Sequence, residues 1–302
     1  MIAAYIFLVG LIIGSFLNVC IHRLPREESV VSPRSRCPQC SHLIAAYDNI
    51  PLLSYLILGG RCRYCKTPVS PRYFIVELIT GLLFFFSYYM NGISVAFAKM
   101  SVLSALLLVL VMIDWQERIL PDKITFPGMA FGAMFSLMTP VGDGASAWLF
   151  RISGIYELPS SIASFSDGLL GALVGAGLLF GIGEIYFRLR GVEGMGFGDV
   201  KMMAMVGFFL GPRLTLLTIF FASIVGSIIG MGIILLLVSK PSYYKRMRRH
   251  FPGIASLRFY CVLFGHKQRR YPIPFGCFLG IAALVAAVWG MPLLNWYLGF
   301  FR

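Results

Sequence analysis

Residues 100–114 read MSVLSALLLVLVMID, a run of fourteen uncharged residues that ends in an aspartate. About 20 apolar residues in a helix cross the hydrocarbon core of a bilayer, which is roughly 30 Å thick. Comparable windows recur along the chain at residues 1–19, 74–90, 100–113, 124–138, 168–187, 214–238 and 273–298, with a shorter one at 200–210. We therefore predict an all-α polytopic membrane protein with about eight transmembrane helices.

The composition agrees with a chain whose main solvent is lipid. Charged residues make up 13% of the sequence and hydrophobic residues 58%, whereas a soluble domain carries roughly a quarter charged residues. The first window has neither a basic segment before it nor a small-residue cleavage site ahead of His22. It is expected to be a retained helix, because a secretory signal peptide has both.

The net charge of +13 is informative about how the chain is oriented in the membrane, because it depends on where Lys and Arg are placed. Loops rich in Lys and Arg stay in the cytosol, so we expect residues 23–72 and 240–270 to be cytosolic and the sparsely charged residues 141–167 to be external. Eight spans then place both termini outside. The basic residues of the two loops include Arg23, Arg26, Arg34, Arg36, Arg61, Arg63, Lys66, Arg72, Lys245, Arg246, Arg248, Arg249, Lys267, Arg269 and Arg270. No nucleic-acid partner is predicted, because membrane topology accounts for the charge.

The predicted organisation has three parts: a first transmembrane helix (1–22), a cytosolic domain (23–72) and a transmembrane bundle (73–302) with a basic cytosolic loop at 239–272. Small residues at helix-packing spacing are expected to let helices approach closely within the bundle. These pairs are Gly171 and Gly175, Gly177 and Gly181, and Gly226 and Gly230.

Two CxxC pairs lie in the cytosolic segment, Cys37 with Cys40 and Cys62 with Cys65. Such pairs at this spacing are typical of zinc ribbons, in which four thiolates surround one tetrahedral ion. About fifty residues bury little core without such a staple. We predict one structural zinc ion per chain in a small zinc-ribbon-like domain. Two disulfides are the alternative, disfavoured in a reducing cytosol, and a redox CxxC pair would need a βαβ unit.

Two aspartates stand where predicted helices meet the cytosol. Asp114 ends the 100–113 window, and Asp199 follows the glycines of Gly196-Phe-Gly-Asp199. A lone acid at such a boundary is usually only solvated, but the glycines leave the backbone beside Asp199 open to a peptide. Hydrolysis of an amide needs one carboxylate to activate water and another to protonate the carbonyl. Asp114 and Asp199 are the candidate catalytic pair, with Gly196, Gly198 and Lys201 as supporting residues.

Other catalytic arrangements are missing from the sequence. It contains no GxSxG and no HExxH motif, and its four histidines are scattered through the basic loops. Gly194, Gly196 and Gly198 imitate a nucleotide-binding loop, but no strand precedes them.

An ordered set of motifs carries a resemblance to a known family. The set is Gly14-Ser-Phe-Leu-Asn-Val-Cys-Ile-His-Arg-Leu-Pro25, the four cysteines, Ser70-Pro-Arg-Tyr73 with Glu77, Asp114 with Leu120-Pro-Asp122, Gly196-Phe-Gly-Asp199 with Lys201, and Pro274-Phe-Gly276. With this set the chain resembles the type IV prepilin peptidases, bifunctional leader peptidases and N-methyltransferases of the bacterial inner membrane, over nearly its whole length.

The resemblance implies a GxGD-type aspartic protease whose catalytic pair is Asp114 and Asp199. It implies that prepilin and pseudopilin precursors are cut at the cytosolic face, after the glycine that closes a basic leader. S-adenosylmethionine would then supply a methyl group to the new N-terminus. The resemblance also assigns the zinc of the cytosolic domain to the four cysteines.

The chain departs from the family pattern at Phe74 and Cys277, where the family usually has proline, and in long loops at 141–167 and 239–272. The basic run at 245–249 is expected to lie on anionic lipid headgroups, with docking of a secretion partner as the alternative. For the whole chain, the alternatives are a methyltransferase-only or inactive relative and a transporter. The transporter would need charged pairs at mid-membrane, and the only charged residues within the windows are Glu77, Glu184 and Lys201.

Overall fold

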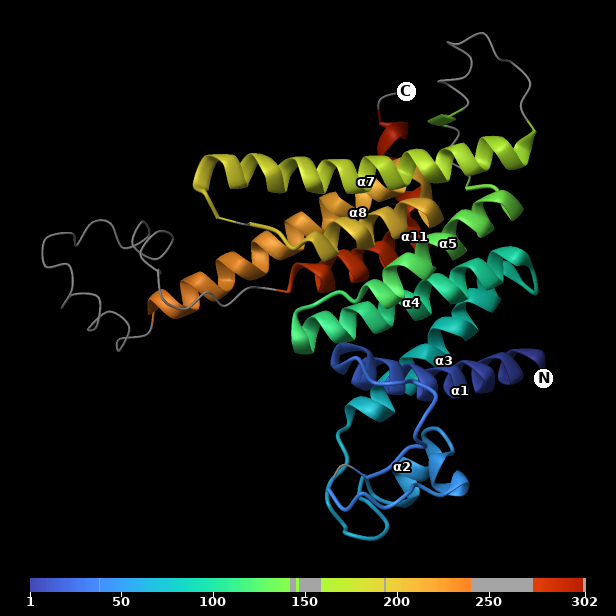
Figure 1. The fold of residues 1–302 in the computed structure, drawn as a ribbon. Helices are drawn as coiled ribbons and strands as arrows, with labels where there is room; N and C mark the ends of the chain where they lie inside the picture. Colours follow the sequence, from blue (N-terminus) through green and yellow to red (C-terminus); the bar gives the residue numbers. More distant parts are fainter. Residues whose placement is uncertain (38, 142–144, 147–158, 193, 240–273, 301–302) are drawn as a thin grey trace, which may run out of the picture.

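The computed structural model describes residues 1–302 apart from 38, 142–144, 147–158, 193, 240–273 and 301–302 (Figure 1). The predicted loop at 239–272 therefore lies almost entirely outside the described residues. The long helices are α1 (Ile2–Arg23), α3 (Arg72–Asn91), α4 (Val95–Glu117), α5 (Asp122–Met138), α7 (Ser160–Arg190), α8 (Phe197–Ser239) and α11 (Phe275–Gly299). Between α1 and α3 lie the short elements η1 (Leu24–Arg26), η2 (Ala46–Asn49) and α2 (Leu53–Ile57).

The all-α prediction is confirmed. Within the described ranges only two isolated β-bridges occur, Arg36 with Leu43 and Arg61 with Pro68. Helices dominate because lipid offers no partner for backbone polar groups, so each spanning segment must satisfy its own. The segment between α1 and α3 lies beside the bundle in Figure 1.

The predicted windows all lie in helices, although fewer helices qualify as spans. Six in the described part of the chain are long and apolar enough to cross a membrane, namely α1, α3, α4, α7, α8 and α11. Helix α5 has 17 residues. The windows at 200–210 and 214–238 both fall within α8, which is interrupted at Gly211. Counting the two arms of α8 separately gives eight helical segments.

Helix α8 reverses direction at Gly211. This residue has φ 78° and ψ 174°, a conformation that glycine adopts without steric cost, and Pro212 follows it. The position of a Cβ on Gly175 of α7 lies 2.8 Å from the carbonyl oxygen of Met203 and 2.8 Å from the methyl of Thr215. Twelve residues of straight helix would separate these two contacts by about 18 Å. The arm before Gly211 and the arm after it therefore lie side by side against α7.

Helix α4 runs through the centre of the bundle. Half of its apolar window is buried, more than in any other candidate span. Its inward side chains meet those of the first arm of α8 and of α11. The fully or almost fully buried apolar residues of these three helices include Leu103, Leu107, Leu110, Ile113, Met202, Met203, Met205, Val206, Phe209, Leu279, Ala283 and Ala286. Elsewhere the helices present Leu, Ile and Phe outward, as expected of surfaces that face lipid.

The tightest helix crossing joins α7 to α8. A Cβ on Gly171 would overlap the carbonyl oxygen of Gly207, and one on Gly207 would overlap the backbone of Gly171. Gly177 and Gly181, on the same helix as Gly171, have no atom within 4 Å of such a Cβ. Only the first predicted glycine pair of α7 therefore lies at a close backbone contact.

Replacing Gly171 by alanine is expected to lower the thermal stability of the detergent-solubilised protein, because the added methyl must push two backbones apart. Gly177→Ala is the matched control on the same helix and is expected to unfold at the wild-type temperature. Equal unfolding temperatures for the two variants would contradict the crossing.

Candidate active site

Asp114 and Asp199 come together in the bundle from different helices. Asp114 lies three residues before the end of α4, and Asp199 lies in the first turn of α8. Both are buried, with relative exposures of 6% and 9%. A Cβ on Gly276 would stand 2.9 Å from Asp114 Oδ2 and 3.1 Å from Asp199 Oδ1. The two carboxylates therefore lie around one point, occupied only by the hydrogen atoms of a glycine.

Helix α4 ends at Glu117, within one turn of Asp114. Arg118 adopts a left-handed conformation with φ 57°, and its N–H donates to the carbonyl oxygen of Asp114 at 3.0 Å. The following Leu120 then packs on the other aspartate's helix, where a Cβ on Gly198 would lie 2.9 Å from the Cβ of Leu120. The turn from α4 to α5 thereby fixes the first turn of α8 next to Asp114.

The two glycines before Asp199 have different surroundings. Gly198 is covered by Leu120, so its lack of a side chain serves packing. Gly196 has only the Asp199 carboxylate within 4 Å of a Cβ, at 3.9 Å. We expected both glycines to leave the backbone beside Asp199 open to a peptide. Of the two, only Gly196 does so.

Helix α11 supplies the third side of the site. The backbone N–H of Cys277 donates to Asp114 Oδ2 at 2.8 Å, and Cys277 Sγ lies 3.2 Å from the carbonyl oxygen of Val111. Proline has no N–H to donate, so this bond depends on the departure from the family pattern at position 277. We did not predict a role for α11 at the carboxylates, although Pro274-Phe-Gly276 was among the family motifs.

Lys201 does not pair with the catalytic candidates. Its ammonium lies 2.7 Å and 2.8 Å from the two carboxylate oxygens of Asp122, and it stands over the rings of Phe126 and Phe197. The pair joins the start of α5 to the start of α8. Its contribution is positional, since a partly exposed ion pair stabilises by at most about 1 kcal/mol.

The first basic segment reaches the end of the bundle that holds the carboxylates. Arg26 lies 3.7 Å from Glu117, and Arg72 donates to Gln116, so the first segment touches the end of α4. The second segment immediately precedes α11, whose first turn contacts Asp114. The carboxylates thus lie at the end of the bundle that the first basic segment contacts.

The four cysteines of the two CxxC pairs form one cluster. The Sγ atoms of Cys37, Cys40, Cys62 and Cys65 all lie within 4.8 Å of one another. Each pair sits in a similar turn: Cys37 N–H donates to the His42 carbonyl and Cys62 N–H to the Thr67 carbonyl, both at 2.9 Å. Four sulfur donors at this separation fit one tetrahedral zinc ion. Hydrogen bonds with Thr67 lower the pKa of Cys65 to about 6. At Cys40 a bond from the His42 backbone is outweighed by burial and by bonds with the other thiols, which raise its pKa to about 11.

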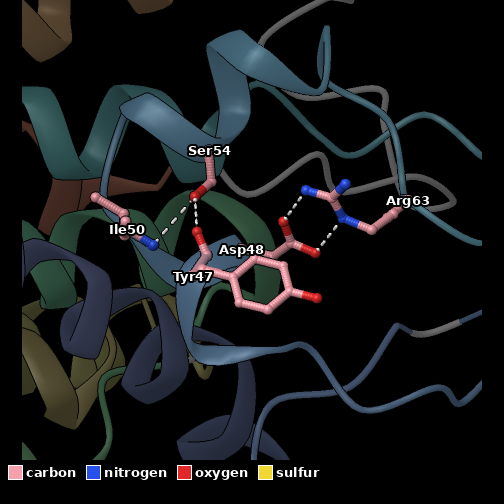
Figure 2. A network of polar contacts seen from close by, with 5 residues as sticks. All are labelled: Tyr47, Asp48, Ile50, Ser54 and Arg63. Atoms are coloured by element: carbon pink, nitrogen blue, oxygen red, sulfur yellow. Dashed lines mark hydrogen bonds and ion pairs between the residues drawn. The ribbon is translucent and has the colours of Figure 1, made fainter.

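Polar contacts tie the second cysteine pair to the rest of its domain (Figure 2). The guanidinium of Arg63, between Cys62 and Cys65, donates to both carboxylate oxygens of Asp48 at 2.7 and 2.5 Å, and this lowers the pKa of Asp48. Ser54 Oγ donates to the Tyr47 carbonyl at 3.0 Å and accepts from the Ile50 N–H at 3.1 Å. These bonds join η2, α2 and the metal-binding turn.

The N-terminal motifs join α1, α3 and the cysteine domain. The side-chain amide of Asn18 donates to the Tyr73 carbonyl at 3.0 Å, and the N–H of Leu52 donates to Glu77 Oε2 at 2.9 Å. A Cβ on Gly14 would lie 2.8 Å from the Cα of Glu77. Asn18, Glu77 and Gly14 therefore serve helix packing and the attachment of the domain, far along the chain from the carboxylates.

Comparison with known proteins places these features in one family. Residues 8–91 match the Bacterial Peptidase A24 N-terminal domain, and residues 101–231 match the Type IV leader peptidase family. The chain belongs to the type IV leader peptidase family. The two matches include α1, the cysteine cluster and both aspartates, whereas α11 lies beyond them.

Relatives in this family are similar along almost the whole chain. A prepilin leader peptidase/N-methyltransferase of Aeromonas hydrophila is 34% identical over 97% of this chain and 92% of its own length. The Pseudomonas aeruginosa protein of the same name is 33% identical over the same shares. The Myxococcus xanthus protein of that name is 42% identical over 77% of this chain and 63% of its own. No solved structure matches the chain.

Replacing Gly276 by alanine is expected to abolish leader cleavage while leaving the metal content unchanged, because the new methyl would fill the space between the carboxylates. The measurement is cleavage of a prepilin by the purified protein, with zinc determined in the same sample. Gly299→Ala, whose Cβ meets no atom within 4 Å, is the control on the same helix. Wild-type cleavage by Gly276→Ala would contradict this description of the site.

Asp48→Asn is expected to speed the release of zinc to a chelator at neutral pH, because Arg63 loses its ionic partner beside two ligands. The folded-state pKa of Asp48 is lowered, so the pair stabilises the domain above the unfolded pKa of about 3.9 and is lost as the pH falls below it. The ratio of variant to wild-type release rates should therefore stay above one down to about pH 4 and approach one only at lower pH, where Asp48 of the folded protein takes up a proton. A ratio of one at neutral pH would show that the pair contributes nothing.

Proposed function

We propose that the chain is a membrane aspartic endopeptidase that cleaves the basic leader of type IV prepilins and pseudopilins and then methylates the new N-terminus. The observation that supports this most directly is the convergence of Asp114 and Asp199 on Gly276. The relatives, named prepilin leader peptidase/N-methyltransferase, support the substrate class and the second activity.

The proposed chemistry uses the two carboxylates alone. Two acids that face one another cannot both ionise readily, so they hold one proton between them. The ionised carboxylate takes a proton from water, which attacks the carbonyl carbon of the leader's last glycine, and the protonated one donates to the carbonyl oxygen. The C–N bond then breaks as the first carboxyl passes its proton to the leaving amine and the second takes one back from the tetrahedral intermediate. The Cys277 N–H fixes Oδ2 of Asp114. Gly196 leaves room for the extended peptide beside Asp199.

The proposed site faces the cytosol of a bacterial inner membrane. The first basic segment contacts the carboxylate end of the bundle, the second precedes α11 in the sequence, and basic loops are retained on the cytosolic side. This orientation suits the substrate, because a leader that has not been exported is reached only from within. The inverted orientation would separate the carboxylates from the leader.

The cysteine domain is proposed to hold one structural zinc ion. Its four sulfur atoms fill a tetrahedral zinc site and leave no open position for a reactive water. The ion therefore serves to stabilise the cytosolic segment. S-adenosylmethionine would supply the methyl group for the second reaction. In this proposal Glu77 holds the zinc domain against α3, and Asn18 joins α1 to α3, while the leader is presented to the carboxylates.

Asp114→Asn and Asp199→Asn are each expected to reduce leader cleavage by about 10²–10⁴-fold, the usual contribution of a positioned acid or base. Co-expression with prepilins and pseudopilins of the same organism, followed by mass spectrometry of their N-termini, measures cleavage and methylation together. Glu117→Gln is the control, because Glu117 is a partly exposed acid at the same end of α4. Full cleavage by either aspartate variant would refute the assignment.

A leader that stays uncleaved in the presence of the wild-type chain, with every candidate precursor, would favour the alternative of a relative that binds but does not cut. The two aspartate variants would then behave like the wild type. The assay thereby separates a wrong choice of residues from a wrong choice of reaction.

A further inference from the structure

Helix α2 of the cysteine domain exposes one apolar face. Leu53, Leu56 and Ile57 stand at spacings of three and four residues and therefore share a side of the helix. Their relative exposures are 50%, 65% and 70%, whereas Ser54 on the inner side is buried. The face points away from the domain to which α2 belongs, so it adds nothing to that domain's core.

Two contacts hold α2 beside the start of a membrane span. The Leu52 N–H donates to Glu77 of α3 at 2.9 Å, and the rings of Tyr55 and Phe74 lie 5.5 Å apart. Glu77 lies five residues into α3, which corresponds to about 8 Å along the helix axis. Because α3 is a candidate span over Arg72–Asn91, α2 lies at the depth where the bilayer begins.

The charges around α2 complement a lipid surface. Residues 23–72 contain eight basic and only three acidic residues. Two of the basic residues, Arg61 and Lys66, follow α2 within ten residues of Ile57, and Arg63 between them is paired with Asp48. An apolar helix face next to basic residues is the pattern of helices that lie in the interface of an anionic bilayer.

We propose that α2 is an interfacial anchor, with Leu53, Leu56 and Ile57 inserted among lipid acyl chains beneath anionic headgroups. The bilayer is the occupant because α3, against which α2 is held, already exposes Ile75 and Ile79 on the same span. The anchor gives the cysteine domain a second attachment to the membrane. The first attachment is the chain itself, which connects the domain to α1 and α3. This inference goes beyond the proposed peptidase activity and does not depend on it.

The test places a tryptophan on the face in the full-length protein. Leu56→Trp and Tyr47→Trp are each reconstituted in vesicles of phosphatidylcholine and phosphatidylglycerol, and the fluorescence added over wild type is recorded. Tyr47 is 63% exposed in the same domain but belongs to η2. Lipids brominated along the acyl chain should quench Leu56→Trp strongly and Tyr47→Trp little. Aqueous iodide should do the reverse.

The anchor would be overturned if iodide quenched Leu56→Trp as readily as it quenches Tyr47→Trp and brominated lipid had no effect on Leu56→Trp. Protection from iodide that appears only when prepilin is added would indicate a protein occupant and would also overturn it. The zinc content of each variant reports whether the domain has folded. Repeating the measurement with Asp114→Asn should give the same quenching, which separates this inference from the peptidase assignment.

A second variant tests the anchor without a fluorophore. Leu56→Glu is expected to raise the rate of tryptic cleavage at residues 61–66 several-fold in vesicles, because the charge expels α2 from the interface. In detergent micelles without acidic lipid the variant should differ less from wild type. Equal rates for variant and wild type in vesicles would count against the anchor.

Discussion

Backbone packing of α7 against the two arms of α8 determines where the second aspartate lies. At Gly171 and Gly175 the helix backbones meet with no side chain between them. In lipid, such contact is a main source of helix association, because apolar side chains gain nothing by leaving acyl chains for one another. The crossing holds the short arm that begins at Phe197, and with it the first turn that carries Asp199. A shift along this crossing would remove Asp199 from Asp114 without changing either residue.

Three helix ends then enclose the carboxylates, and each end is specified differently. The end of α4 is set by the left-handed turn at Arg118, and the start of α8 is packed by Leu120 on Gly198. The start of α11 contributes a glycine and an N–H. Burial of two acids at one point is unfavourable for a helix bundle on its own, since a buried charge without compensation is costly. The proposed peptidase chemistry requires two acids at one point, and this accounts for a burial that packing alone does not favour.

The sequence alone was sufficient to predict the helices, because a bilayer leaves few alternatives for an apolar run of spanning length. The cysteine cluster and the pair of aspartates were also predictable, since residue type and spacing reveal them. The contact of α11 with Asp114 was not, because it joins residues 163 positions apart through a backbone N–H that no side-chain pattern encodes. The separate roles of Gly196 and Gly198 were hidden for a similar reason. In the sequence both are glycines shortly before an aspartate. They differ in the structure because Leu120 covers Gly198 and not Gly196.

The position of Gly276 also has a consequence for biosynthesis. Helices α4 and α8 leave the ribosome before α11, so for a time the nascent chain holds both aspartates without the glycine and the N–H that complete their surroundings. In the proposed peptidase, the two carboxylates therefore gain this glycine and this N–H only when α11 joins the bundle.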